Sequence, residues 1–218
     1  RFEKNKYAQP QNVVHFTGNN VEDIIGLIGK YGDSLVKVFK LTEQQKQQEI
    51  IKTNLIDPVK IQEKFNVTLD IPQNFDLVLE KKSFLWYKKE ILGGNSSLLI
   101  YKVPFRALLR NDNLVGNIIN VRDIVGAKYI KGKLPNTRMI TEESYAPYFQ
   151  STLLANRRTY ETKGTWELKG DYMSGSFINY AIMDRDKREF LILEGFCYAP
   201  SIPKRDLMHE LEAIIKSV

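Results

Sequence analysis

Cysteine is almost absent from this sequence, since Cys197 is the only one in 218 residues. A single cysteine excludes any disulfide within the chain and any zinc site built from cysteines. Histidine is nearly as scarce, with only His15 and His209, which argues against an imidazole-rich metal site. We therefore expect neither a metal nor another cofactor, and we interpret Cys197 as a small buried apolar residue.

Long apolar runs are also missing. No segment approaches the roughly 18 consecutive apolar residues that cross a bilayer, and the longest runs, such as residues 190–193, have the length of a strand. The first residues do not have the pattern of a signal peptide. Because the chain begins with Arg1 and not with Met, we expect that an upstream segment has been removed.

The composition is that of a folded globular protein. Hydrophobic residues make up 43% of the chain and charged residues 27%, and eleven Tyr, eleven Phe and two Trp can fill a large core. A length of 218 residues fits one large domain or two closely packed halves. We predict a single compact α+β unit over residues 1–218, with two packed halves, about 10–105 and 106–218, as the alternative.

Hydrophobic periodicity predicts helices and strands in alternating runs. Helices are expected near residues 20–28, 32–48, 58–65, 113–131 and 203–218. Strands are expected near residues 12–17, 67–71, 75–80, 84–90, 97–103, 137–142, 148–154, 158–161, 165–169, 177–183 and 189–198. This order predicts the α+β class, with an antiparallel sheet covered by helices. It also permits two ferredoxin-like halves.

The net charge of +6 is concentrated in one window. Residues 102–138 contain eight basic and two acidic side chains, so the rest of the chain is neutral. Arginine forks suit phosphate or carboxylate ligands, so an anion-binding face is one interpretation and an ordinary solvated surface is the other. The candidate anion-binding residues are Arg106, Arg110, Arg122, Lys128, Lys131 and Arg138. The nearby aromatic residues have a core-like pattern, which does not favour nucleic acid as the partner.

Glu194 is the most informative acidic residue. Alternation along the last strand places it on one face with four large apolar or aromatic side chains. A carboxylate in such surroundings is costly to ionise unless it is paired. We therefore predict a buried ion pair between Glu194 and an Arg or Lys. The alternative is a catalytic acid with a raised pKa in a cleft.

Several segments resemble an uncharacterised domain-of-unknown-function family of bacterial cell-envelope proteins, many of them apparent lipoproteins. The segments that carry the resemblance are Phe84–Trp86, Arg122–Asp123, Lys128–Gly132, Gly164–Glu167, Asp171–Phe177, Glu194–Pro200, Lys204–Arg205 and Glu210–Ala213. The resemblance covers most of the chain from about residue 10 and is clearest in the last third. The family pattern has Gly and Pro where this chain has Ser174 and Ser176, which puts that loop's conformation in doubt.

The resemblance implies a location in the cell envelope and a signal with a lipid-attachment cysteine upstream of Arg1. It brings no established activity and therefore no catalytic residues. The leading hypothesis is a non-enzymatic envelope protein that binds a protein partner or an anionic ligand and meets the membrane only through its lipid anchor. The alternative is a hydrolase or transferase that uses Glu194 with a basic residue in a cleft. The oligomeric state does not follow from the sequence.

Overall fold

The computed structural model describes all 218 residues, which divide by their internal contacts into two units, Arg1–Gln47 and Gln48–Val218. The first unit contains the strands β1 (Phe2–Lys4) and β2 (Asn12–Val14) and most of the helix α1 (Val21–Ile51). The two strands form an antiparallel hairpin. The Asn12 side-chain amide donates a hydrogen bond of 2.7 Å to the Thr42 hydroxyl of α1, so the hairpin and the helix are joined.

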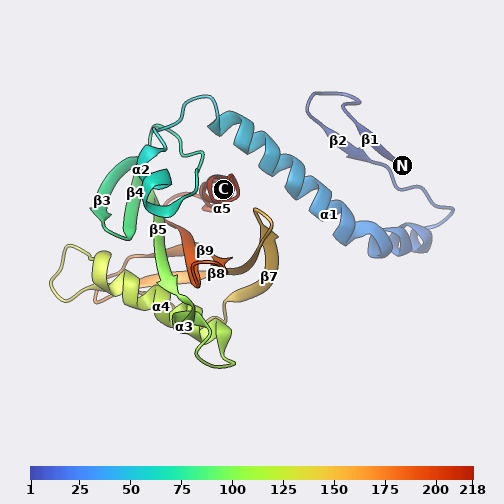
Figure 1. The fold of residues 1–218 in the computed structure, drawn as a ribbon. Helices are drawn as coiled ribbons and strands as arrows, with labels where there is room; N and C mark the ends of the chain where they lie inside the picture. The colour runs from blue at the N-terminus through green and yellow to red at the C-terminus, as the bar shows by residue number, and fades with distance from the viewer. The chain divides into compact units, whose positions relative to one another are not determined.

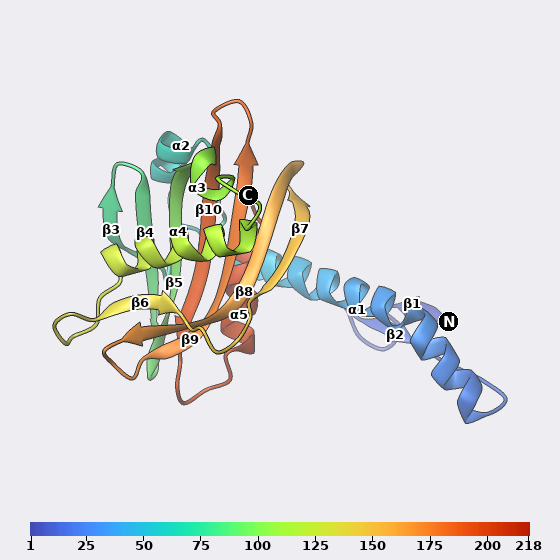
Figure 2. The same cartoon turned by 90° about the horizontal axis from the view of Figure 1, so that it is seen from below.

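The helix α1 is continuous where the sequence predicts two helices. The predicted N-cap is confirmed, since the side-chain oxygen of Asn20 accepts a hydrogen bond of 2.8 Å from the Asp23 backbone. Gly32, at which a second helix was expected to begin, lies inside α1. The helix instead bends part-way along its length (Figures 1 and 2). No helix of the structure combines the length and the apolar character needed to cross a membrane.

The second unit is built on one curled sheet of eight strands, and every strand pairing in it is antiparallel (Figure 1). The strands are β3 (Asp76–Lys81), β4 (Phe84–Ile91), β5 (Gly94–Pro104), β6 (Arg138–Thr141), β7 (Tyr148–Leu154), β8 (Arg157–Lys169), β9 (Ser174–Asp184) and β10 (Glu189–Tyr198). Their order is β3-β4-β5-β10-β9-β8-β6, and β7 pairs with the other end of β8. The predicted α+β class with an antiparallel sheet is thereby confirmed.

Helices cover both faces of this sheet. They are α2 (Val59–Phe65), α3 (Phe105–Leu108), α4 (Leu114–Tyr129) and α5 (Arg205–Ile215). In Figure 2, α4 crosses one face of the sheet and α5 lies behind the other face. The alternation of β10 divides the core accordingly, because Phe190, Ile192 and Phe196 join the cluster under α4. Leu191 and Leu193 join the cluster that includes α2 and α5.

Several predicted elements differ from the observed ones. The strand predicted at 67–71 does not form, and its buried side chains instead fill the core beside α2. The strands predicted at 158–161 and 165–169 are one strand, β8. The two ferredoxin-like halves do not have separate sheets, because β5 pairs with β10 over its whole length. Whether all 218 residues form one compact unit stays a prediction.

Candidate functional site

Glu194 lies in the core and forms an ion pair with Arg122, as predicted for a carboxylate on this strand face. The Glu194 carboxylate is 2.9 Å from Arg122 Nε, and the two side chains are 2% and 1% exposed. Asn179 Nδ2 donates a hydrogen bond of 2.9 Å to the second carboxylate oxygen. The Arg122 guanidinium also stacks over the Phe177 ring, 3.8 Å from its centroid. Each charged group is therefore enclosed by partners from α4, β9 and β10.

Side chains of α4 and β6 make the next hydrogen bonds around this ion pair. Arg122 Nη1 donates a hydrogen bond of 2.8 Å to the hydroxyl of Thr141, which donates one of 2.7 Å to Asp123. Burial raises the pKa of Glu194, and the charge of Arg122 opposes that rise. The Glu194 side chain is closed off from solvent, with only 2% of its surface exposed. With this burial and its contacts to Arg122 and Asn179, the Glu194 side chain has the surroundings of a structural ion pair.

The opposite face of the sheet carries a second charged cluster. Lys163 on β8 lies 2.7 Å from Glu161 and 3.2 Å from Glu212 of α5. The Tyr180 hydroxyl donates a hydrogen bond of 3.0 Å to Glu212, and Lys216 lies 2.7 Å from the same carboxylate. Burial would raise the pKa of Glu212, but the lysines and Tyr180 outweigh it, so the pKa lies below its ordinary value. All of these charges are paired with one another.

The structure does not bring the predicted anion-binding residues together. Arg122 is in the core, whereas the other five side chains are exposed. Arg106 and Arg110 precede α4, and Lys128 and Lys131 lie at its far end, about 24 Å away along a helix of 16 residues. Arg138 lies on β6, close to the second group. Whether any of the exposed residues binds an anion stays a prediction.

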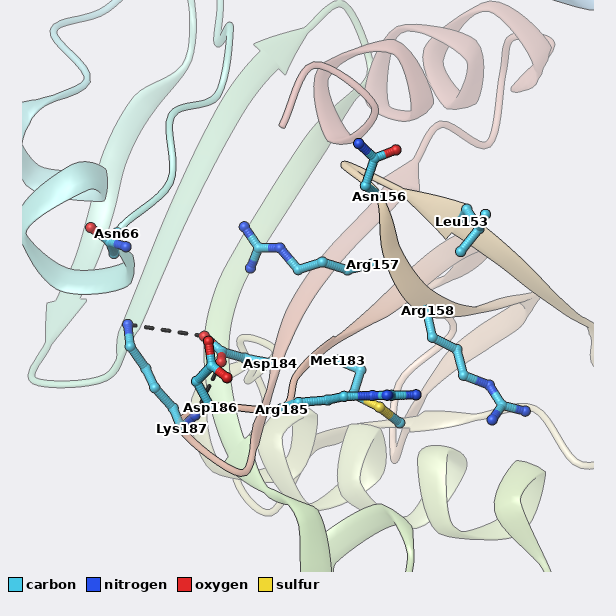
Figure 3. A pocket seen from close by; sticks show the side chains of 10 residues that line it. All are labelled: Asn66, Leu153, Asn156, Arg157, Arg158, Met183, Asp184, Arg185, Asp186 and Lys187. Atoms are coloured by element: carbon cyan, nitrogen blue, oxygen red, sulfur yellow. Dashed lines mark hydrogen bonds and ion pairs between the residues drawn. The ribbon is translucent and has the colours of Figure 1, made fainter.

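A cavity of about 680 Å³ lies elsewhere, at the end of the sheet where β7 turns into β8 and β9 into β10 (Figure 3). Its lining residues are Asn66, Leu153, Asn156, Arg157, Arg158, Met183, Asp184, Arg185, Asp186 and Lys187. Four of these are cationic and two anionic, so the lining carries a net charge of +2. Lys187 is 4.0 Å from Asp184, which is the only ion pair among these residues. An excess of unpaired cations suits an anionic ligand.

Arg157 is the side chain best placed to meet such a ligand. It is half-buried, and it makes no ion pair and no side-chain hydrogen bond. In Figure 3 it extends toward the side of the cavity where Lys187 and Asp184 meet, whereas Arg158 points away. Arg158 instead stacks on the Tyr160 ring, 5.5 Å from its centroid. A half-buried guanidinium without an acidic partner leaves five donors for a phosphate or a carboxylate.

The local sequence explains why the cavity has this rim. The two residues between β7 and β8, Ala155 and Asn156, have φ angles of 49° and 57°, as in a tight type I′ hairpin turn. Asn66 ends α2 with a φ of 58°, a conformation that asparagine tolerates. In the turn after β9, the Asp184 side chain accepts a hydrogen bond of 3.1 Å from the Lys187 backbone. These turns hold the basic side chains at one end of the sheet.

Comparison with protein families identifies the second unit. A family model described as a domain of unknown function, DUF4837, matches residues 53–217. The chain belongs to the DUF4837 family. A second domain of unknown function, DUF8532, is similar to residues 1–52, so the two matches meet close to the boundary between the two units. A search of the curated proteins found no match. A match to domains of unknown function is thus confirmed, but it divides between two families where one was expected from about residue 10. The envelope location stays a prediction.

The sequence indicated the buried acid of this DUF4837 chain but not its cavity. Glu194 has a local signal, because strand alternation places a carboxylate among aromatic residues. The cavity has no such local sequence signal, because Asn66, Arg157 and Lys187 come close only when the strands pair in their observed order. The tandem arginines Arg157–Arg158 next to a two-residue turn were the one available hint. No group of three or more His, Cys, Asp or Glu side chains is placed to hold a metal ion.

Proposed function

We propose that this DUF4837 protein is a non-enzymatic binding protein of the bacterial cell envelope, and that it takes up a small anionic ligand in the cavity beside Arg157. The observation that carries the proposal is the half-buried Arg157 guanidinium, which faces a cavity of about 680 Å³ without an acidic partner. Phosphate and carboxylate groups match the planar fork of arginine. Lys187 and Asn66 supply further polar contacts around it.

The envelope location, with a lipid anchor upstream of Arg1, is supported by the sequence resemblance to envelope lipoproteins. Binding in place of catalysis is supported by the surroundings of the ionisable groups. Glu194 is enclosed by Arg122 and Asn179, and Glu212 by two lysines and Tyr180. Glu194 faces no open cleft. Glu212 lines a cavity of about 380 Å³, but both of its carboxylate oxygens are already in contact with lysines or Tyr180. Membrane fractionation of the full-length protein in a bacterial host tests the location.

The ligand proposal is tested by isothermal titration of the purified chain with tripolyphosphate and with citrate at low salt. Charge-assisted hydrogen bonds contribute about 1.5–3 kcal/mol each, so Arg157→Gln should weaken binding by roughly ten- to a hundredfold. Arg138→Gln is the matched control, because it removes the same charge from an exposed arginine that does not line the cavity. We expect it to change the affinity by less than about threefold.

Two outcomes would contradict the proposal. If the parent protein binds neither anion at low salt, the cavity is not an anion site of this kind. If both arginine variants weaken binding equally, the anion responds to overall charge rather than to the Arg157 guanidinium. In that case the exposed cations Arg106, Arg110 and Arg138 become the next candidates, and their triple charge reversal should lower the salt needed for elution from heparin.

A further inference from the structure

The N-terminal unit exposes an apolar face on α1 that has the spacing of a helix–helix seam. Apolar side chains recur at alternating intervals of three and four residues along the helix, which is the a/d pattern of a coiled coil. The seam consists of Val21, Ile24, Ile28, Tyr31, Leu35 and Val38. Ile25, Leu27, Phe39 and Leu41 flank it. We call these ten apolar residues the α1 face.

Much of the α1 face is open to solvent. Seven of its members are exposed by more than a third, including Val21 at 65%, Ile25 at 63% and Ile28 at 50%. At about 150–200 Å² for a large side chain, they present roughly 600 Å² of apolar surface, which is at the upper end for a monomeric protein. Two such faces together would bury about 1,200 Å², the lower bound for a specific, stable interface.

The glycines of α1 indicate that the helix depends on packing. Gly26, Gly29 and Gly32 lie within seven residues of one another in the helix interior. A Cβ at Gly26 or Gly29 would meet nothing within 4 Å, so no close approach requires them. Glycine destabilises a helix by about 0.5–1 kcal/mol relative to alanine. With three glycines in its N-terminal half, this helix gains its stability from contacts of its apolar face.

The charges of α1 favour a second helix over a lipid surface as the occupant. Between Val21 and Ile51 the helix carries four lysines and five acidic residues, so it has no excess of positive charge to attract anionic lipids. Acidic residues occur in both halves of the helix, with Glu22 and Asp23 in the first turn and Glu43 and Glu49 among the lysines of the second half, so the charges do not set the direction of a second helix.

We propose that two copies of this chain associate through their α1 faces. The interface is isologous, because the same face serves both copies. Ile28 and Tyr31 lie in the middle of the apolar run from Val21 to Val38, and therefore in the buried part of this interface. The N-terminal unit therefore serves for self-association, and the ligand cavity of the second unit is a separate feature of the molecule.

The test is the mass of the full chain by light scattering and sedimentation at about 1–100 μM, a range in which interfaces of this size commonly form. We expect a dimer for the parent. Ile28→Asp should weaken the dimer at least about tenfold, because it places a charge in the apolar seam. Val36→Asp is the matched control, since Val36 is 48% exposed on the same helix but lies off the seam. It should leave the dimer intact, and circular dichroism should show equal helix content in both variants.

Cross-linking tests the face in the same preparation. Chains that carry Ile28→Cys or Tyr31→Cys, mixed in equal amounts, should oxidise to disulfide-linked dimers, because both positions lie in the middle of the seam. Val36→Cys chains should not. Cys197, the only native cysteine, is buried. A parent that stays monomeric at 100 μM would overturn the proposal, and so would equal weakening by Ile28→Asp and Val36→Asp. A monomer that binds vesicles of neutral and anionic phospholipid would show that lipid is the occupant instead.

Discussion

The two faces of the eight-stranded sheet both carry ion pairs, but the two groups differ in their access to water. Under α4, Arg122 and Glu194 are no more than 2% exposed. Under α5, Glu212 and Lys163 are 22% and 38% exposed, and each contacts more than one oppositely charged group. The first pair is a closed contact, whereas the second is a network open to solvent at its rim.

This difference teaches that burial, more than the number of contacts, decides what a charge contributes. A fully buried ion gains strong attraction from its partner but loses its hydration, so the net stabilisation is small while the loss of one partner is severe. A partly hydrated network loses less hydration, and the lowered pKa of Glu212 shows that its lysines and Tyr180 favour the ionised form. Three substitutions, at ion pairs of increasing exposure to solvent, test whether the loss of stability decreases in the same order.

The largest effect is expected for Arg122→Met. This change leaves the Glu194 carboxylate buried without its cation, and breaking a buried pair in this way costs about 3–5 kcal/mol of the free energy of unfolding. Urea unfolding of the parent and the variant, followed by tryptophan fluorescence, measures the loss. The double variant Arg122→Met, Glu194→Leu removes both charges and should recover most of it. A single variant within about 1 kcal/mol of the parent would contradict the burial argument.

The buried pair also shows which features of the site could be predicted from the sequence. The final strand was predicted with its observed bounds, Glu189–Tyr198, because alternating aromatic and apolar residues leave little freedom there. A partner for Glu194 was predicted, but its identity was not, since Arg122 reaches it only after α4 packs across β9 and β10. Arg122 was predicted to be a surface cation because its helix lies within the basic window of residues 102–138. Sequence spacing gives the face of an element but not what covers it.

The helix α1 and the cavity beside Arg157 show the same limit of prediction from the sequence. The residues of α1 predicted helical structure correctly, and a break near Gly32 was wrong because the flanking apolar positions hold one register across the glycine. The cavity beside Arg157 could not be predicted, since it depends on the order in which the strands pair. Local patterns therefore specify elements, and long-range pairing specifies the candidate site.

An intermediate effect is expected for Glu212→Gln, with a dependence on pH. The hydrogen bonds of Glu212 to Tyr180 and Lys216 involve a charged acceptor but are partly hydrated, so we expect a loss of about 1–2 kcal/mol at neutral pH. Because its pKa is lowered below 4.5, the contribution is present above that value and is lost as the pH falls through the folded pKa. The difference between parent and variant should therefore shrink as the pH falls below 4.5 through the folded pKa.

Unfolding at several pH values measures this, and Glu143→Gln is the control because Glu143 is exposed and makes no ion pair. A difference between parent and Glu212→Gln that does not shrink as the pH is lowered would mean that the side chain acts through shape and not through charge. The network around Glu212 would then resemble the closed pair under α4, and the proposed difference between the two faces of the sheet would be wrong.

The smallest effect is expected for Glu80→Gln at the exposed edge of the sheet. Glu80 on β3 lies 3.1 Å from Lys60 and 3.0 Å from Lys64, both on α2, and its side chain is 38% exposed. Hydrogen bonds from Lys64 and Lys60 lower the pKa of the carboxyl, although water competes for each of these contacts. We therefore expect the urea midpoint of the variant to match that of the parent.

In the parent, the Glu80 pKa followed by nuclear magnetic resonance should rise toward its ordinary value at about 1 M salt, where the screening length is about 3 Å. A stability loss as large as that of Glu212→Gln would show that ion-pair geometry outweighs hydration in this protein.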